Sequence, residues 1–127
     1  MDAQQELFTA LKLELEARGY AVYDGALPPE DAPYPFVYLD DFSQTDVELK
    51  NAFTGTVYPM IHVWHNKAGQ RGTVSMMLFE IKTIMRKLVR TDNFAWLVRN
   101  INTRIIPDNT TKTPLLHGVI EADCLFS

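Results

Sequence analysis

A single ten-residue segment, Thr56 to His65, constrains the fold more than any other part of the sequence. It is rich in branched and aromatic residues and is followed by a break that contains two glycines. Successive side chains of a strand point to opposite faces of a sheet. A strand here therefore has two apolar faces, one with Val57, Ile61 and Val63 and the other with Tyr58, Met60, His62 and Trp64. An antiparallel sheet usually keeps one polar face, so part of this chain or of another must cover the second set.

Two other segments carry apolar residues at helical spacing. Residues 3–18 place Leu7, Phe8, Leu11 and Leu15 on one stripe, with Asp2 as the expected N-cap and Gly19 as the expected stop. Residues 73–89 form the second expected helix, with Thr73 as its cap. Its apolar stripe consists of Val74, Met77, Ile81, Ile84, Met85 and Leu88.

The remaining segments predict strands and turns. Short strands are expected at 20–23 and 36–39, on either side of a proline-rich loop over 25–33. Residues 95–106 and 115–126 predict a hairpin whose turn, 107–114, is framed by two prolines. The order of elements predicts a single α+β domain over 1–127, with an antiparallel sheet of four to five strands and two helices packed mainly on one face.

Residues 40–55 are polar with sparse apolar positions. We expect an exposed and mobile connection here, with either end continuing a neighbouring strand. Such a connection is longer than is usual in a compact domain, and long loops are often functional. Asp46, Glu48 and Lys50 are therefore candidate interface residues.

Composition excludes several classes of protein. The 127 residues are 46% hydrophobic and 22% charged, with a net charge of −4 and a pI near 5.3, which disfavours binding to duplex nucleic acid. The lone cysteine, Cys124, is expected to be a small core residue in a reducing cytoplasm. No signal peptide and no bilayer-spanning run is recognisable, so we expect no membrane partner and folding in the cytoplasm.

The sequence carries no recognisable catalytic or metal-binding motif. His62 and His65 are three residues apart on a strand and should point to opposite faces, so they cannot chelate one ion together. The adjacent Asp40 and Asp41 should diverge in the same way. Gly69 and Gly72 lack the spacing of a phosphate-binding loop. We therefore expect a protein that is not an enzyme and needs no cofactor or metal.

Exposed apolar residues favour a protein interface instead. Phe79 should lie on the polar side of the second helix beside Arg86 and Arg90, and aromatic residues and Arg are enriched at interfaces. Met76 also leaves the core stripe. The basic end of this helix has a simpler reading as a complement to the helix dipole, which we prefer to a nucleic-acid contact. Trp96 and Val98 are expected to extend the surface formed by Tyr58, Met60, His62 and Trp64.

In their order, these segments resemble the tail-completion, or tail-terminator, proteins of long-tailed phages and prophages. The resemblance rests on the first helix followed by Val22-Tyr-Asp-Gly25 and on the stretch Ala32-Pro-Tyr-Pro-Phe-Val-Tyr-Leu39. It continues with Ile61-His-Val-Trp-His65 before a glycine-containing turn and long helix, and ends with Leu116-His-Gly-Val119 in the last hairpin. It spans nearly the whole chain.

This resemblance implies a structural virion protein that caps the tail tube as a ring, typically a hexamer, at the head-proximal end of the tail. Its partners would be copies of itself, the tail tube protein and a head-completion or neck protein. Two alternatives remain open from the sequence. One is a head-closure or neck connector protein, and the other is a small ligand-binding or regulatory module with a closed pocket at Tyr58, His62 and Trp64.

Overall fold

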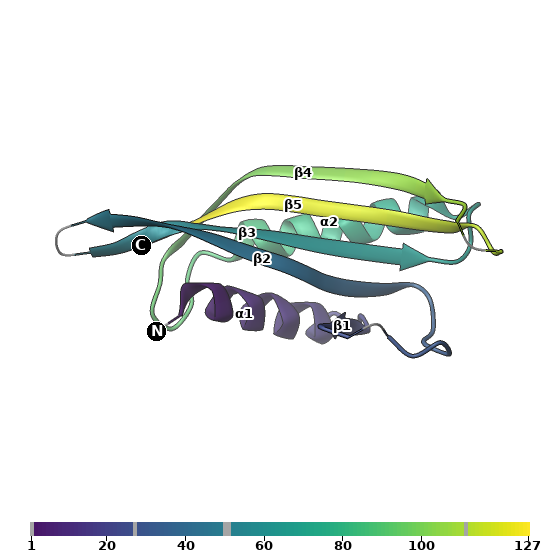
Figure 1. Cartoon of the computed structure of the whole chain (residues 1–127), viewed down its shortest axis with the longest axis horizontal. Helices are drawn as coiled ribbons and strands as arrows, with labels where there is room; N and C mark the ends of the chain where they lie inside the picture. Colours follow the sequence, from purple (N-terminus) through teal and green to yellow (C-terminus); the bar gives the residue numbers. More distant parts are fainter. Residues whose placement is uncertain (1, 27, 50–51, 111) are drawn as a thin grey trace.

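The computed structural model describes residues 2–26, 28–49, 52–110 and 112–127, and the side chains of residues 52 and 53 are not considered. These residues fold into one five-stranded sheet with two helices (Figure 1). In chain order the elements are α1 (Ala3–Ala17), β1 (Val22–Asp24), β2 (Phe36–Leu49), β3 (Ala52–His65), α2 (Arg71–Lys87), β4 (Trp96–Asp108) and β5 (Leu115–Phe126).

The sheet has the strand order β1-β2-β3-β5-β4, so β4 and the short β1 are its edges. All neighbours are antiparallel except β1 and β2, which are parallel. Helix α1 packs against β2 and α2 against β4 and β5, and the two helices also contact each other. This arrangement confirms the expected α+β class with both helices on one face. The expected all-antiparallel sheet is approximate, because of the β1–β2 pair.

Helix α1 follows its sequence pattern closely. The Asp2 side chain accepts a hydrogen bond from the Gln5 backbone N–H at 3.2 Å, and Gly19 ends the helix with a φ of 90°. The positive φ is a conformation that glycine adopts without steric cost. Leu7, Leu11 and Leu15 are buried against the sheet. The predicted cap, stop and core stripe of this helix are therefore confirmed.

Helix α2 begins two residues before the predicted start. Its N-cap is Gln70, which makes no capping hydrogen bond through its side chain, so the prediction that Thr73 caps the helix was wrong. The predicted stripe is buried from Val74 to Met85, with Leu78 as a further buried residue, whereas Leu88 lies just past the end of the helix and is only partly buried. Gly118 of β5 lets the helix pack closely, because a Cβ at this position would lie 2.8 Å from Cγ1 of Val74.

The predicted connection at residues 40–55 belongs instead to strands β2 and β3 over 40–49 and 52–55, and its residues 50 and 51 lie outside the described residues. Strands β2 and β3 stay paired from Phe42 and Pro59 out to Leu49 and Ala52. The last pair between β3 and β5 joins Gly55 to Phe126, so the end of the β2–β3 hairpin extends beyond the rest of the sheet (Figure 1). We call residues 45–49 and 52–54 the hairpin arm. Residues 45–49 are exposed on both faces, so the alternation of Val47 and Leu49 with Asp46 and Glu48 does not mark a buried side.

The base of the hairpin arm is closed by aromatic side chains on the helix side of the sheet. The Phe126 ring packs edge-on against Phe94, with ring centroids 5.3 Å apart, and lies 5.6 Å from the ring of Trp96. A Cβ on Gly55 would lie 2.8 Å from the Phe126 ring and 2.3 Å from the Thr45 carbonyl oxygen, so this strand position needs glycine. Trp96 is buried and Val98 packs on the same core. The expectation that both extend the opposite face was therefore wrong.

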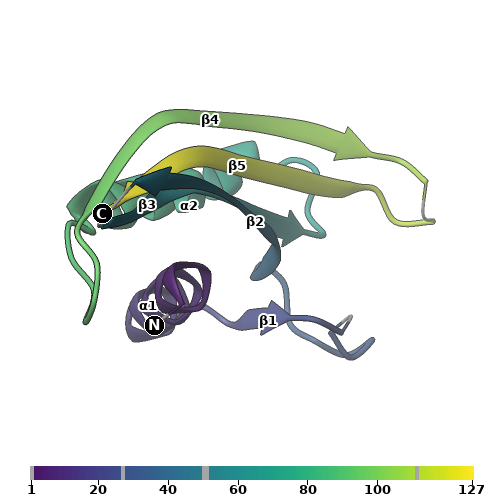
Figure 2. The same cartoon turned by 60° about the vertical axis from the view of Figure 1, so that its left-hand side comes forward.

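Two β-bulges lie almost level across the sheet. On β2, Asp40 and Asp41 together stand opposite Met60, and on β4, Asn100 and Ile101 together stand opposite Ala122. Met60 pairs with Glu121, the neighbour of Ala122, so the bulges fall in adjacent rows. An extra residue bends a strand and increases its twist. The strands bend in this way in Figure 2, where β4 and β5 arch over α2.

Candidate protein-interaction surface

The face of the sheet turned away from the helices, which we call the outer face, carries the second apolar set of β3. Tyr58 is exposed, and Met60, His62 and Trp64 are partly exposed. Their neighbours Val57, Ile61 and Val63 are fully buried on the helix side. The predicted division of β3 into two faces is confirmed. Since neither Met60 nor Trp64 is buried within a single chain, an interface role for them stays a prediction.

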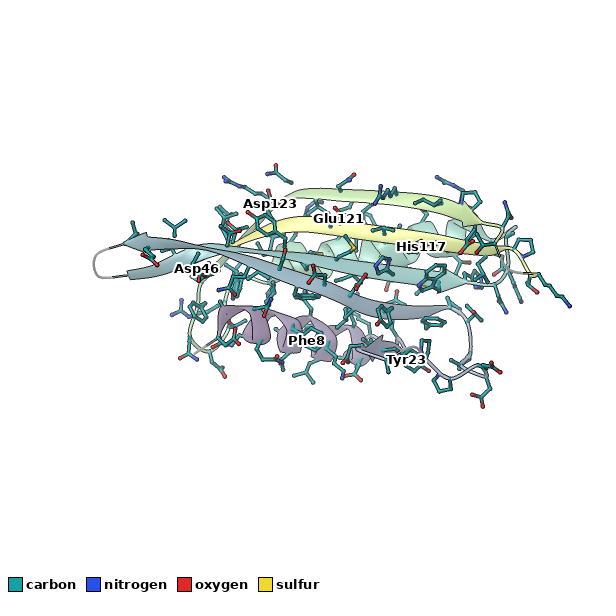
Figure 3. The ribbon with its side chains drawn as sticks, viewed as in Figure 1. Phe8, Tyr23, Asp46, His117, Glu121 and Asp123 are labelled. Carbon is teal, nitrogen blue, oxygen red and sulfur yellow. The ribbon has the colours of Figure 1, made fainter. Side chains whose placement is uncertain are left out.

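A stack of rings crosses the outer face from β3 to β5. The His117 ring lies parallel to the Trp64 indole, with ring centroids 3.9 Å apart and planes 4° apart. The His62 ring also stacks on His117, with its centroid 4.7 Å from that of His117. Register explains this row, because Trp64 pairs with His117. The position of His117 on β5, in line with Glu121 and Asp123, is visible in Figure 3.

Hydrogen bonds extend this stack to β2. The Asp40 carboxylate lies 2.8 Å from Nε2 of His62, and Nδ1 of His62 lies 2.5 Å from Nε2 of His117. One ring nitrogen of His62 thus faces Asp40 and the other faces His117, so the three side chains form a continuous polar row. Burial, together with the neighbouring His62, lowers the pKa of His117 to about 4. His117 is therefore neutral near pH 7.

The bulge in β2 corrects the prediction for Asp40 and Asp41. Strict alternation after Leu39 would turn Asp41 to the helix side. The extra residue of the bulge shifts the alternation by one position, so Phe42 points to the helix side instead and packs against Phe8. Both carboxylates are exposed, and Asp41 lines a hollow together with Met60. The two side chains thus share the outer face.

An aromatic groove of about 450 Å³ runs beside the ring stack. The proline-rich segment before β2 forms one wall, held by the Tyr34 ring, which lies 5.1 Å from the Phe36 ring between centroids. Trp64 and His62 of β3 form the floor of the groove, and Leu115 at the start of β5 also lines it. The full lining is Pro28, Pro29, Glu30, Ala32, Tyr34, Phe36, Tyr38, Asp40, His62, Trp64, Asp108 and Leu115.

The aromatic groove is acidic. Glu30, Asp40 and Asp108 line it, and within the described part of the chain it has no Lys or Arg in its lining. The Thr110 hydroxyl and backbone N–H donate to the Asp108 carboxylate at 2.7 and 2.9 Å, and these hydrogen bonds lower the pKa of Asp108. A groove with apolar walls and carboxylates suits an occupant that is both apolar and cationic.

A separate hollow of about 200 Å³ lies at the level of the bulges, lined by Tyr58 and Met60 among acidic and amide side chains. Tyr58 therefore lies in a different hollow from His62 and Trp64. The hypothesis of a ligand-binding module required these three residues to line one pocket, and they do not.

The predicted residues of α2 form a second surface. Met76 and Phe79 are 58% and 59% exposed, and Arg86 is exposed in the same row. We call Met76, Phe79, Thr83 and Arg86 the α2 stripe. At 100° per residue this stripe is opposite the buried side of the helix, so it points away from the sheet. Arg90 is exposed just beyond the end of α2.

The hairpin arm is the third surface. Asp46 and Glu48 are exposed on it, as predicted, and Lys50 lies outside the described residues. Sequence reasoning missed Val47 and Leu49, which are 51% and 55% exposed. They were hidden by the assumption of a loop, because only a strand places them together on one side. Leu97 and Ile106 of β4 are further exposed apolar residues that the sequence did not single out.

The cysteine of the chain does not lie on these surfaces. Cys124 is buried, and burial raises the pKa of its thiol to about 12. Among the described residues no group of three or more His, Cys, Asp or Glu side chains could hold a metal ion. In the same part of the chain, no helix has the length and apolar character to cross a membrane.

Two solved structures with the same fold come from a virion and from a bacteriophage. One is a chain from the virion of a native gene transfer agent particle, 14% identical, with a TM-score of 0.65, covering 98% of this chain and 95% of that one. Another is the gp17 protein of bacteriophage SPP1, 23% identical, with a TM-score of 0.62, covering 96% of this chain and 89% of that one. No protein-family model and no curated protein sequence matches this chain. The likeness shows a fold shared over the whole length.

Proposed function

We propose that this chain is a structural protein of virion assembly that caps the phage tail tube as a ring, ends tail polymerisation and forms the surface that joins the head. The observation that carries the proposal is the fold shared from end to end with a gene transfer agent virion chain and with SPP1 gp17. The resemblance of the sequence motifs to tail-terminator proteins supports the same role independently.

The surfaces of the chain suit a ring. A cyclic ring is built from heterologous contacts, in which two different patches of neighbouring subunits meet. Among the described residues, the outer face, the α2 stripe and the hairpin arm are three separate surfaces that expose apolar side chains. Two of them can serve neighbouring subunits, which leaves one for the tail tube.

We assign the hairpin arm to contacts outside the subunit. It extends beyond the sheet (Figure 1), and its side chains Val47 and Leu49 have no covering layer in the chain itself. In this proposal the partners are copies of the same chain in a hexamer, the tail tube protein, and a head-completion or neck protein. The site of action is the head-proximal end of the tail, with assembly in the host cytoplasm.

A neck or head-closure connector is the second candidate, because a ring with the same fold could serve on either side of the junction. The fold likeness to a chain of a whole virion supports both positions equally. Cryo-microscopy of the particle distinguishes them by locating the chain at the tail end or on the head side of the neck.

Deletion of the coding sequence tests the proposal. We expect particles without the protein to have tails of irregular or excessive length, and heads that remain unjoined. Expression of the wild-type chain in trans should restore both properties, and electron microscopy measures the tail lengths. Tails of normal length together with normal joining would rule the function out.

A further inference from the structure

We infer that the aromatic groove of one subunit receives the α2 stripe of a second copy of this chain. The inference rests on the proposed function in one respect, namely that the chain works as an oligomer, and it names the two surfaces that meet. The occupant is argued from charge, from apolar content and from the placement of the two surfaces on the fold.

Charge complementarity is the first argument. The groove is lined by the carboxylates of Glu30, Asp40 and Asp108, without a Lys or Arg among its described lining residues. The stripe ends in Arg86, followed by Lys87, at the basic end of α2. Opposite charges on facing patches orient an encounter and fix its register. The two surfaces therefore attract each other, whereas two grooves, or two stripes, repel.

Apolar content is the second argument. Phe79 and Met76 are large side chains exposed on the stripe, and exposed apolar patches on soluble proteins usually mark interaction sites. The groove presents the rings of Tyr34 and Trp64 with Leu115 beside them. An aromatic anchor that enters an aromatic pocket is a common centre of binding energy. Arg86 can then reach the carboxylates while Phe79 occupies the apolar part.

The placement of the surfaces is the third argument. The groove lies on the outer face of the sheet, and the stripe points away from the sheet on the helix side. One chain cannot bring them together, so the contact must be between copies. Since each copy has one groove and one stripe, the contact repeats from head to tail, and it closes into a ring if the rotation per subunit allows.

Charge reversal on each surface provides the main test. Arg86→Glu damages the stripe and Glu30→Lys damages the groove, and both residues are exposed. We expect each variant to weaken self-association at least tenfold, and the double variant to return to within about threefold of wild type because the charges match again. Sedimentation equilibrium of the full chain measures the constants. Glu16→Lys and Arg99→Glu make the same charge changes elsewhere and should have no effect.

Chemical cross-linking locates the contact. A variant with both Phe79→Cys and Leu115→Cys carries one thiol on each surface, and the native Cys124 is buried. With a short bis-maleimide, we expect a ladder of covalent oligomers from this variant at high concentration. Each single variant should give dimers at most. Circular dichroism and thermal melts of every variant confirm that the chains are folded.

Three outcomes would overturn the inference. One is a double-cysteine variant that gives no oligomers beyond those of the single variants. Another is self-association that charge reversal leaves unchanged, or that the double reversal fails to restore. The third is loss of binding to tail tubes without loss of self-association, which would assign the groove to a different protein. None of these affects the tail-length test, so the two proposals can fail separately.

Discussion

His117 on β5 and Trp64 on β3 lie face to face, with their ring centroids 3.9 Å apart and their planes 4° apart. This contact links the aromatic groove, which Trp64 lines, to the polar row of His62 and Asp40. Since stacking on the indole covers one side of the imidazole, the environment of His117 disfavours its protonated form.

We predict that the chain loses stability as the pH falls from about 6.5 to about 4. Burial lowers the pKa of folded His117 to about 4 from an ordinary value of 6.5, so the unfolded chain takes up the proton first. The contribution of neutral His117 to the stability of the fold is complete above about pH 6.5 and is lost progressively as the pH falls to about 4. With screening at this partly exposed ring, we expect a change on the order of 1 kcal/mol, or about 4 °C in melting temperature.

The matched variant is His117→Asn, which cannot titrate in this range. Its melting temperature should change less between pH 7 and pH 4.5 than that of the wild-type chain, although both chains also respond to their carboxylates. Equal slopes in the two chains would contradict the assignment to His117.

We predict that Gly118→Ala destabilises the fold by about 1–3 kcal/mol through overpacking. The new Cβ would lie 2.8 Å from Cγ1 of Val74 and 3.2 Å from Cδ1 of Leu78, and both of these side chains are buried. Chemical denaturation measures the free energy of unfolding. Gly69→Ala is the control, because nothing lies within 4 Å of a Cβ there, and it should change stability by less than about 0.5 kcal/mol.

We predict that Cys124 of the folded chain resists alkylation. Burial raises the pKa of its thiol to about 12 from 9, so the reactive thiolate at pH 8 should be about a thousandfold rarer than in an exposed thiol. Mass spectrometry after treatment with iodoacetamide measures the labelled fraction. The same chain in urea should label rapidly, and rapid labelling without urea would show that β5 opens.

We predict that the apolar side of the hairpin arm matters more for assembly than its acidic side. A double variant with Val47→Thr and Leu49→Thr keeps strand-forming residues and should change the free energy of unfolding by less than about 0.5 kcal/mol. Its capping of tails in a complementation assay should fall about tenfold, since apolar anchors dominate most interfaces. The matched variant, Asp46→Asn with Glu48→Gln, should lose less than about threefold. Similar losses in both variants would contradict the prediction.

Much of the fold followed from local patterns. The stripe of Leu7, Leu11 and Leu15 and the Asp2 cap are signals of short range, and the structure retains them. The two faces of β3 followed from alternation alone. The alternation also predicted correctly that Met60 and Trp64 lie on the outer face, because side chains alternate strictly between the two faces wherever a strand has no bulge.

The errors arose where long-range pairing decided the structure. Residues 45–49 of the hairpin arm have no buried face, and the alternation of Val47 and Leu49 with Asp46 and Glu48 is too short to predict a strand by itself. The pairing of β2 with β3 reveals it. Trp96 was assigned to the wrong face because nothing local predicted the aromatic cluster with Phe94 and Phe126. The bond between His62 and His117 depends on register between β3 and β5, which the sequence does not specify by itself.

The two bulges give the sheet a crease. They lie in adjacent rows, on β2 and β4, and Pro59 of β3, which has no N–H to donate, lies beside them. The backbone ladder is thus interrupted along one line between the aromatic groove and the hairpin arm. The angle between these two surfaces is set by main-chain geometry at the crease, so surface substitutions can retune what each one binds without altering the direction in which the arm points.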